Sequence, residues 1–138
     1  MSDAYAVVRA DDAPDYAQGK TPGHEFRGYG ELGSEQVSLN VIVMEPGTTH
    51  KVPGMDDDIG HSHEDIDEIY IVASGRVTVK AGDDEVELGP LDAIRLAPEV
   101  VRSTRNTSDA PATVVMLSPK MRDPRAQSHF EERFWPAS

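Results

Sequence analysis

Residues 61–75 read HSHEDIDEIYIVASG and carry the strongest structural signal in the chain. His61 and His63 are two positions apart, so on a β-strand both side chains project to the same face. Glu68 then opens an apolar run that ends at Gly75. A carboxylate at the start of a buried strand needs a positively charged or hydrogen-bonding partner, because burying an isolated charge is costly. A metal ion held by the two histidines would supply that partner.

The rest of the chain repeats the pattern of short, β-branched runs that end at turn residues. Runs of this kind are typical of an all-β sandwich or barrel. Residues 79–86 predict a hairpin around a Gly-Asp-Asp turn. The apolar or alternating runs lie at residues 37–44, 68–72, 76–80, 85–88, 92–97 and 112–117.

The length of 138 residues is that of one ordinary domain. We expect a single domain in three parts. An N-terminal arm with an edge strand occupies residues 1–36, a barrel occupies residues 37–118, and a tail occupies residues 119–138.

The tail carries a helix signal. Ser128 and Glu131 have the spacing of a capping box, and Phe130 and Phe134 lie four positions apart. These spacings predict a short C-terminal helix that ends before Pro136 and packs its aromatic side chains on the barrel or on a partner subunit.

The charge balance excludes several classes of partner. The chain has 25 acidic and 13 basic residues, a net charge of −12, and no cysteine. Such a surface repels phosphate backbones and anionic membranes, so we expect no nucleic-acid and no membrane partner. The lack of cysteine excludes disulfides and thiolate sites. Residues 1–13 have no signal-peptide pattern, and the apolar run at residues 41–44 is too short to span a bilayer, so we expect a cytoplasmic protein.

Two histidines and one carboxylate form a facial ligand set that leaves coordination positions open for oxygen, water or substrate. Non-haem iron uses this set, and zinc or manganese could use the same ligands. The sequence does not distinguish Fe, Mn, Zn and Ni.

The spacing of His61, His63, Glu68 and Gly75 resembles the first sequence motif of the cupins, and residues 92–106 resemble their second motif. The two motifs together cover roughly residues 40–117. The resemblance implies an all-β, antiparallel double-sheet jelly-roll barrel with the site inside it. It also implies that His61, His63 and Glu68 are metal ligands.

One position departs from the family pattern: Arg102 stands where metal-binding cupins usually have a third histidine. In a first account the ion keeps three ligands and Arg102 clamps an anionic substrate. In a second, His50 supplies the additional ligand, although its surroundings read as a loop. In a third, the metal is absent and Arg102 pairs with Glu68. The first is favoured, because three ligands already satisfy an open metal site.

Other residues complete the expectations. Tyr70 shares a strand face with Glu68 and is assigned, with Arg102, to substrate binding, with barrel packing as the alternative. His24 and His129 are expected at the surface or at a helix cap. Exposed sheet edges and the aromatic tail indicate a homodimer.

Two functions follow from these expectations. One is a metal-dependent enzyme of the oxygenase, isomerase or lyase type that acts on a small, anionic organic substrate. The other is a metal-free, non-catalytic small-molecule-binding or sensor protein.

Overall fold

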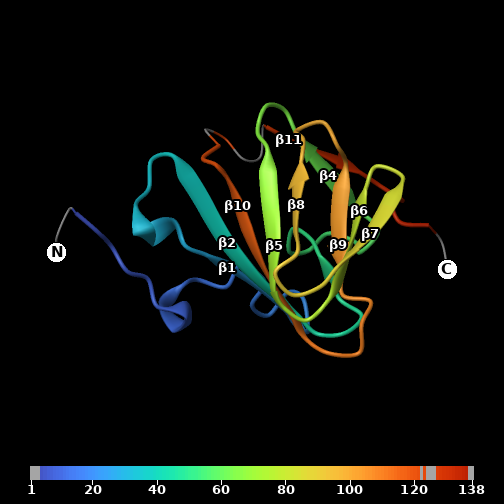
Figure 1. Cartoon of the computed structure of the whole chain (residues 1–138), viewed down its shortest axis with the longest axis horizontal. Coiled ribbons are helices and arrows are strands. Elements are labelled where there is room, and N and C mark those ends of the chain that lie inside the picture. The colour runs from blue at the N-terminus through green and yellow to red at the C-terminus, as the bar shows by residue number, and fades with distance from the viewer. Residues whose placement is uncertain (1–3, 122, 124–126, 137–138) are drawn as a thin grey trace.

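Two antiparallel β-sheets face each other (Figure 1). The computed structural model describes residues 4–121, 123 and 127–136. Consecutive strands alternate between the sheets along much of the chain, which is the arrangement of a jelly roll. The all-β jelly roll expected from the sequence is confirmed.

The strands of the first sheet, in spatial order, are β1 (His24–Gly28), β2 (Val37–Met44), β10 (Ala112–Pro119), β5 (Glu68–Ser74) and β8 (Ala93–Leu96). Those of the second are β11 (Ser128–Glu131), β4 (Gly60–His63), β9 (Arg102–Arg105), β6 (Val77–Ala81) and β7 (Asp84–Leu88), with β3 (Thr49–His50) paired to β9. Two short 3-10 helices, η1 (Ala10–Asp12) and η2 (Gly30–Leu32), precede β2. No helix in the described part of the chain has the length and apolar character that a membrane span needs.

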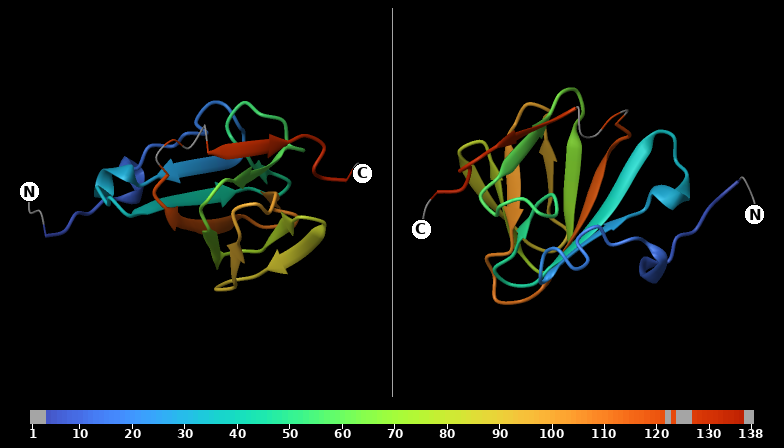
Figure 2. Two further views of the ribbon diagram at one scale, coloured as in Figure 1. Left: turned by 90° about the horizontal axis from the view of Figure 1, so that it is seen from above. Right: turned by 180° about the vertical axis from the view of Figure 1, so that it is seen from behind.

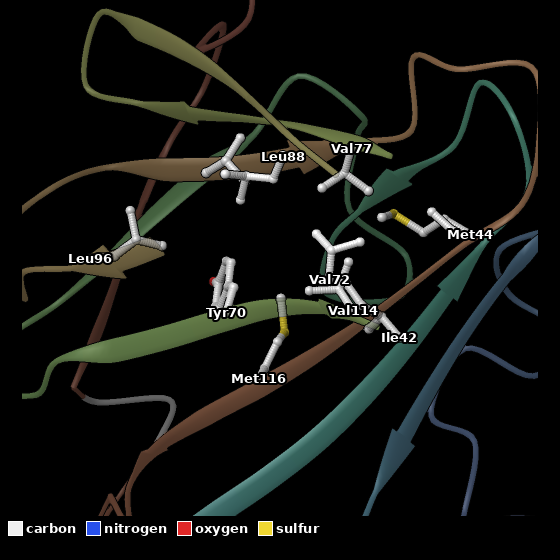
Figure 3. Packing of buried hydrophobic residues seen from close by; sticks show 11 residues of the cluster. Ile42, Met44, Tyr70, Val72, Val77, Leu88, Leu96, Val114 and Met116 are labelled. Atoms are coloured by element: carbon white, nitrogen blue, oxygen red, sulfur yellow. The ribbon is translucent and has the colours of Figure 1, made fainter. Parts of the chain in front are cut away.

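The core lies between the sheets, where side chains from both layers meet (Figure 3). The alternation of strand side chains places every second residue of β2, β5, β6 and β10 in this layer. Full burial of each aliphatic side chain contributes roughly 1.5–3 kcal/mol to folding. The buried cluster is Ile42, Met44, Tyr70, Val72, Val77, Val79, Leu88, Leu96, Ala112, Val114 and Met116.

Glycines with positive φ end two of the runs. Gly82 (φ +59°) lies in the two-residue turn of the β6–β7 hairpin, which confirms the predicted hairpin. Gly75 (φ +77°) follows β5, where a Cβ atom would collide with the carbonyl oxygen of Pro111. Any other residue at this turn would be strained, because L-residues seldom adopt positive φ.

The predicted C-terminal helix is wrong. Residues 128–131 form strand β11, which pairs antiparallel with β4 and lies along one edge of the second sheet (Figure 2). The capping-box spacing is a local signal, whereas pairing with β4 satisfies the backbone groups of an otherwise open sheet edge. The aromatic residues that follow are buried: Phe134 packs on Gly60, and Trp135 donates a 2.7 Å hydrogen bond from Nε1 to Ser103 Oγ.

Candidate metal centre

Two strands that follow each other in the chain, β4 and β5, bring His61, His63 and Glu68 together. The Nε2 atom of His63 lies 3.1 Å from Oε1 of Glu68, and Nε2 of His61 lies 3.7 Å from the same oxygen. One ligand atom from each of the three residues lies within 4.8 Å of the other two. The i, i+2 spacing on β4 and the start of β5 at Glu68 produce this convergence.

Two of the three distances among these atoms are close to those expected around one divalent ion. Zinc binds imidazole nitrogen and carboxylate oxygen at about 2.0–2.2 Å, so ligand atoms that share an ion lie roughly 3.0–3.6 Å apart. The two distances to Glu68 lie close to this range. Imidazole and carboxylate together suit the divalent first-row transition metals.

The protonation states also suit a metal. Burial lowers the pKa of His61, so its imidazole stays neutral at neutral pH. Burial alone would raise the pKa of Glu68, but hydrogen bonding to His61 and His63 outweighs this effect and lowers that pKa. A neutral imidazole and an ionised carboxylate are the forms that bind metal ions.

Arg102 of β9 contacts the same carboxylate. It stands opposite His61 in the β4–β9 register, and its side chain is fully buried. Nη1 donates to Oε1 of Glu68 at 3.2 Å and Nη2 donates to the Ala97 carbonyl at 2.6 Å, while Nε has no partner among the described residues. The guanidinium thus lies against Glu68, as in the third account, while the three ligand atoms converge as the first account requires.

Tyr70 gives Glu68 a further hydrogen bond. Its hydroxyl donates to Oε1 of Glu68 at 3.1 Å from a side chain that is almost fully buried. Burial, and next the Glu68 charge, raise the pKa of Tyr70, so the phenol keeps its proton at neutral pH. One carboxylate oxygen therefore faces Tyr70, Arg102, His63 and His61.

Ser128 supports the other side of His63. Its Oγ lies 3.1 Å from Nδ1 of His63, and the two residues are register partners in the β11–β4 pair. A hydrogen bond at the far nitrogen fixes the orientation of a metal-binding imidazole. Sequence reasoning misses Ser128, because the capping-box spacing assigns it to a helix. The i, i+2 alternation of Ser128 with Phe130 is the signal that could have found it.

A cavity of about 690 Å³, lined by residues of both sheets, adjoins this cluster. His61, His63, Glu68 and Tyr70 line it, and much of the remaining wall is apolar. Within the described part of the chain, Glu68 is the one acidic residue in the wall, and Arg102 is not a wall residue. A mainly apolar cavity with a few convergent polar groups is typical of a small-molecule site.

Two other histidines lie where the sequence does not place them. His50 belongs to strand β3 rather than to a loop, and it lines the cavity. His24 is buried in β1 rather than exposed at the surface, because its ring packs beside His50 and Phe26.

His129, on β11, is exposed as expected and lies near Glu64. The group of atoms close enough to share an ion comprises His61, His63 and Glu68, whereas Nδ1 of His50 is hydrogen-bonded to His24.

Comparison with solved structures supports the fold. A cupin-superfamily sugar phosphate isomerase from Silicibacter pomeroyi is 19% identical, with a TM-score of 0.64, over 94% of this chain and 85% of that chain. The polyketide cyclase RemF from Streptomyces resistomycificus is 15% identical, with a TM-score of 0.70, over 94% and 89%. KdgF from Halomonas sp. is 16% identical, with a TM-score of 0.64, over 86% and 96%. At these identities the likeness shows the fold alone.

Sequence comparison identifies the family. No curated protein sequence matches the chain significantly. The family profile described as Cupin domain matches residues 40–118, from the middle of β2 to the end of β10. Because this match covers more than half of the sequence, the chain belongs to the cupin family.

Proposed function

We propose that the chain binds one divalent transition-metal ion through His61, His63 and Glu68 and acts on a small, anionic organic molecule in the adjoining cavity. The observation that carries this proposal is the convergence of three metal-binding atoms within 4.8 Å at the cavity wall. A bound ion would supply Lewis-acid polarisation of a ligand oxygen.

Charge supports an anionic substrate. The chain as a whole carries a net charge of −12, yet within the described part of the chain the charged groups of the cavity wall are one ammonium, of Lys51, and one carboxylate, of Glu68. Arg102 compensates the charge of that carboxylate from behind the wall. An ion at this site would leave excess positive charge, and an anionic ligand would neutralise it.

The chain's own groups would position the substrate. Tyr70 and Arg102 hold the Glu68 carboxylate, and Ser128 holds His63, so the ligand atoms keep their places without a substrate. The apolar wall, which includes Phe26, would exclude water from the bound molecule. The reaction proposed is of the oxygenase, isomerase or lyase type.

A second function is a metal-free binding protein, and a specific contact favours it. Oε1 of Glu68 already accepts hydrogen bonds from Arg102 and Tyr70, and it lies 3.1 Å from His63. A carboxylate with these partners is electrostatically satisfied without an ion. In that case the cavity would bind an acidic ligand and catalyse no reaction.

Elemental analysis separates the two functions. Protein purified without chelator or histidine tag, then incubated with Fe(II), Mn(II), Ni(II) or Zn(II) and desalted, should retain about one equivalent of metal per chain, the capacity of a single three-ligand site. His61→Ala and His63→Ala should lose most of this metal. His129→Ala, which removes an exposed histidine outside the cavity, should retain it. Absence of bound metal, or equal retention by all three variants, would overturn the metal site and favour the binding protein.

A further inference from the structure

A second pair of histidines joins the two sheets at the cavity. His24 lies on β1 of the first sheet, and His50 lies on β3, which pairs with the second. His24 Nε2 and His50 Nδ1 are 3.2 Å apart, and the ring centroids are separated by 5.3 Å at an edge-on angle of 66°. Phe26, two residues from His24 on β1, also packs edge-on against His50, with the ring centroids 4.8 Å apart. The His50 ring is therefore held by one hydrogen bond and two ring contacts from β1.

The orphaned nitrogen of His24 indicates where the protons lie. His24 is 5% exposed, and its Nδ1 is buried with no hydrogen-bond partner among the described residues. A proton on this Nδ1 would leave a buried N–H without an acceptor, which carries the full desolvation cost of that group. The proton of His24 therefore belongs on Nε2, where it is donated to Nδ1 of His50.

This arrangement determines what His50 offers to the cavity. Because its Nδ1 accepts the bond from His24, the proton of a neutral His50 is on Nε2. Burial lowers the pKa of both rings, that of His50 to about 3, so both are neutral at neutral pH. His50 lines the same cavity as His61, His63 and Glu68. His24 is not among the lining residues, so the Nε2–H of His50 is the donor that this pair offers to a ligand in the cavity.

We propose that His50 is a ligand anchor, a neutral N–H donor that His24 holds in place for an oxygen atom of the molecule bound in the cavity. His50 is a ligand-binding residue in this role, and His24 is a positioning residue. The inference rests on the proposed function only in that the same cavity receives the ligand. It also excludes His50 as an additional metal ligand, because metal at Nε2 would require the His50 proton on Nδ1.

Nitrogen-15 NMR of histidine-labelled protein at pH 7 tests the proton positions directly. We expect His24 and His50 both to be neutral, with the proton on Nε2 of each ring. In His24→Phe, which keeps a ring but removes the donor, we expect the His50 signals to shift toward a mixture of the two neutral forms. A proton on Nδ1 of His50, or a charged ring on either residue, would overturn the proposal.

Benzoate tests the anchor, because it combines a carboxylate with a ring that suits an apolar wall. His50→Phe keeps the packing against Phe26 and removes the donor, so benzoate should bind about tenfold more weakly, the loss typical of a hydrogen bond to a charged group. His50→Gln retains an N–H donor and should recover most of this loss. Toluene, which has no acceptor oxygen, should bind all three proteins alike.

Equal benzoate binding by the wild-type protein and His50→Phe, including no binding by either, would contradict the anchor role. The NMR spectrum of each variant shows whether it is folded. The outcome is independent of the metal site. If protein that binds no metal shows the expected proton positions and the expected effect on benzoate binding, the anchor role of His50 stands and the proposed metal function is wrong.

Discussion

Arg102 donates a hydrogen bond from Nη1 to Oε1 of Glu68 across 3.2 Å, from a side chain with no exposed surface. The contact places a permanent positive charge beside a carboxylate that the proposed ion also needs. Burying a charge pair removes both groups from water, and the interaction between them offsets this cost only while both partners are present. Arg102 should therefore stabilise the folded, metal-free protein and weaken its affinity for a metal ion.

Replacement of Arg102 separates these two effects. Arg102→Gln keeps hydrogen-bond donors near Glu68 but removes the charge, so the metal-free protein should lose about 3 kcal/mol of unfolding free energy. Metal affinity should rise about tenfold or more, because a positive charge next to the ion has gone. Urea denaturation and metal titration measure the two quantities. A variant with unchanged stability and weaker metal binding would show that Arg102 has another role.

Ser128 should affect metal binding through His63. Ser128→Ala removes the hydroxyl 3.1 Å from His63 Nδ1, and loss of such a partner lowers metal affinity about 10- to 100-fold. His129→Ala on the same strand is the matched control, because that side chain is largely exposed and is not part of the cavity wall. Competition with a coloured chelator gives both affinities. If the two variants bind metal equally well, Ser128 does not orient the ligand.

Trp135 should contribute strongly to stability. It is 6% exposed, donates a hydrogen bond to Ser103, and has the guanidinium of Arg105 stacked 4.2 Å above its ring. Trp135→Ala should reduce the unfolding free energy by about 3–5 kcal/mol. Trp135→Phe keeps a ring and loses the N–H, so it should cost about 1 kcal/mol. Similar midpoints for all three proteins in urea would show that the tail does not pack on the barrel.

Stability should depend on pH through His24 and His50. Burial lowers the pKa of both, so the folded state binds fewer protons than the unfolded state below the usual histidine pKa of 6.5. Stability should therefore be highest above about pH 6.5 and fall as the pH drops below it, in the case of His50 down to its pKa of about 3, with a slope of up to about 1.4 kcal/mol per pH unit for each proton. Urea midpoints between pH 7 and pH 5 measure the slope. His50→Gln should reduce it, whereas an unchanged slope would place the titration elsewhere.

The sequence predicts the convergence of His61, His63 and Glu68 because the geometry of this cluster is local. Residues two apart on a strand share a face, so the joint position of His61 and His63 follows from β4 alone. The position of Ser128 does not follow from local spacing, because it depends on which sheet edge pairs with residues 128–131. His24 is buried for a similar reason: the pairing of β1 with β2 brings it to His50, 26 residues later in the chain. Local spacing does not predict such contacts, because they form between strands that are far apart in the sequence.

Anomalous diffraction from crystals grown with Mn(II) or Zn(II) tests the central claim most directly. We expect one strong peak per chain within bonding distance of His61 Nε2, His63 Nε2 and Glu68 Oε1, at about 2.0–2.2 Å for zinc. Arg102 and Tyr70 should remain hydrogen-bonded to the carboxylate, and the His24–His50 pair should carry no metal. Crystals that contain metal elsewhere, or that show the Glu68 carboxylate bound by Arg102 and the histidines with no peak among them, would contradict the account.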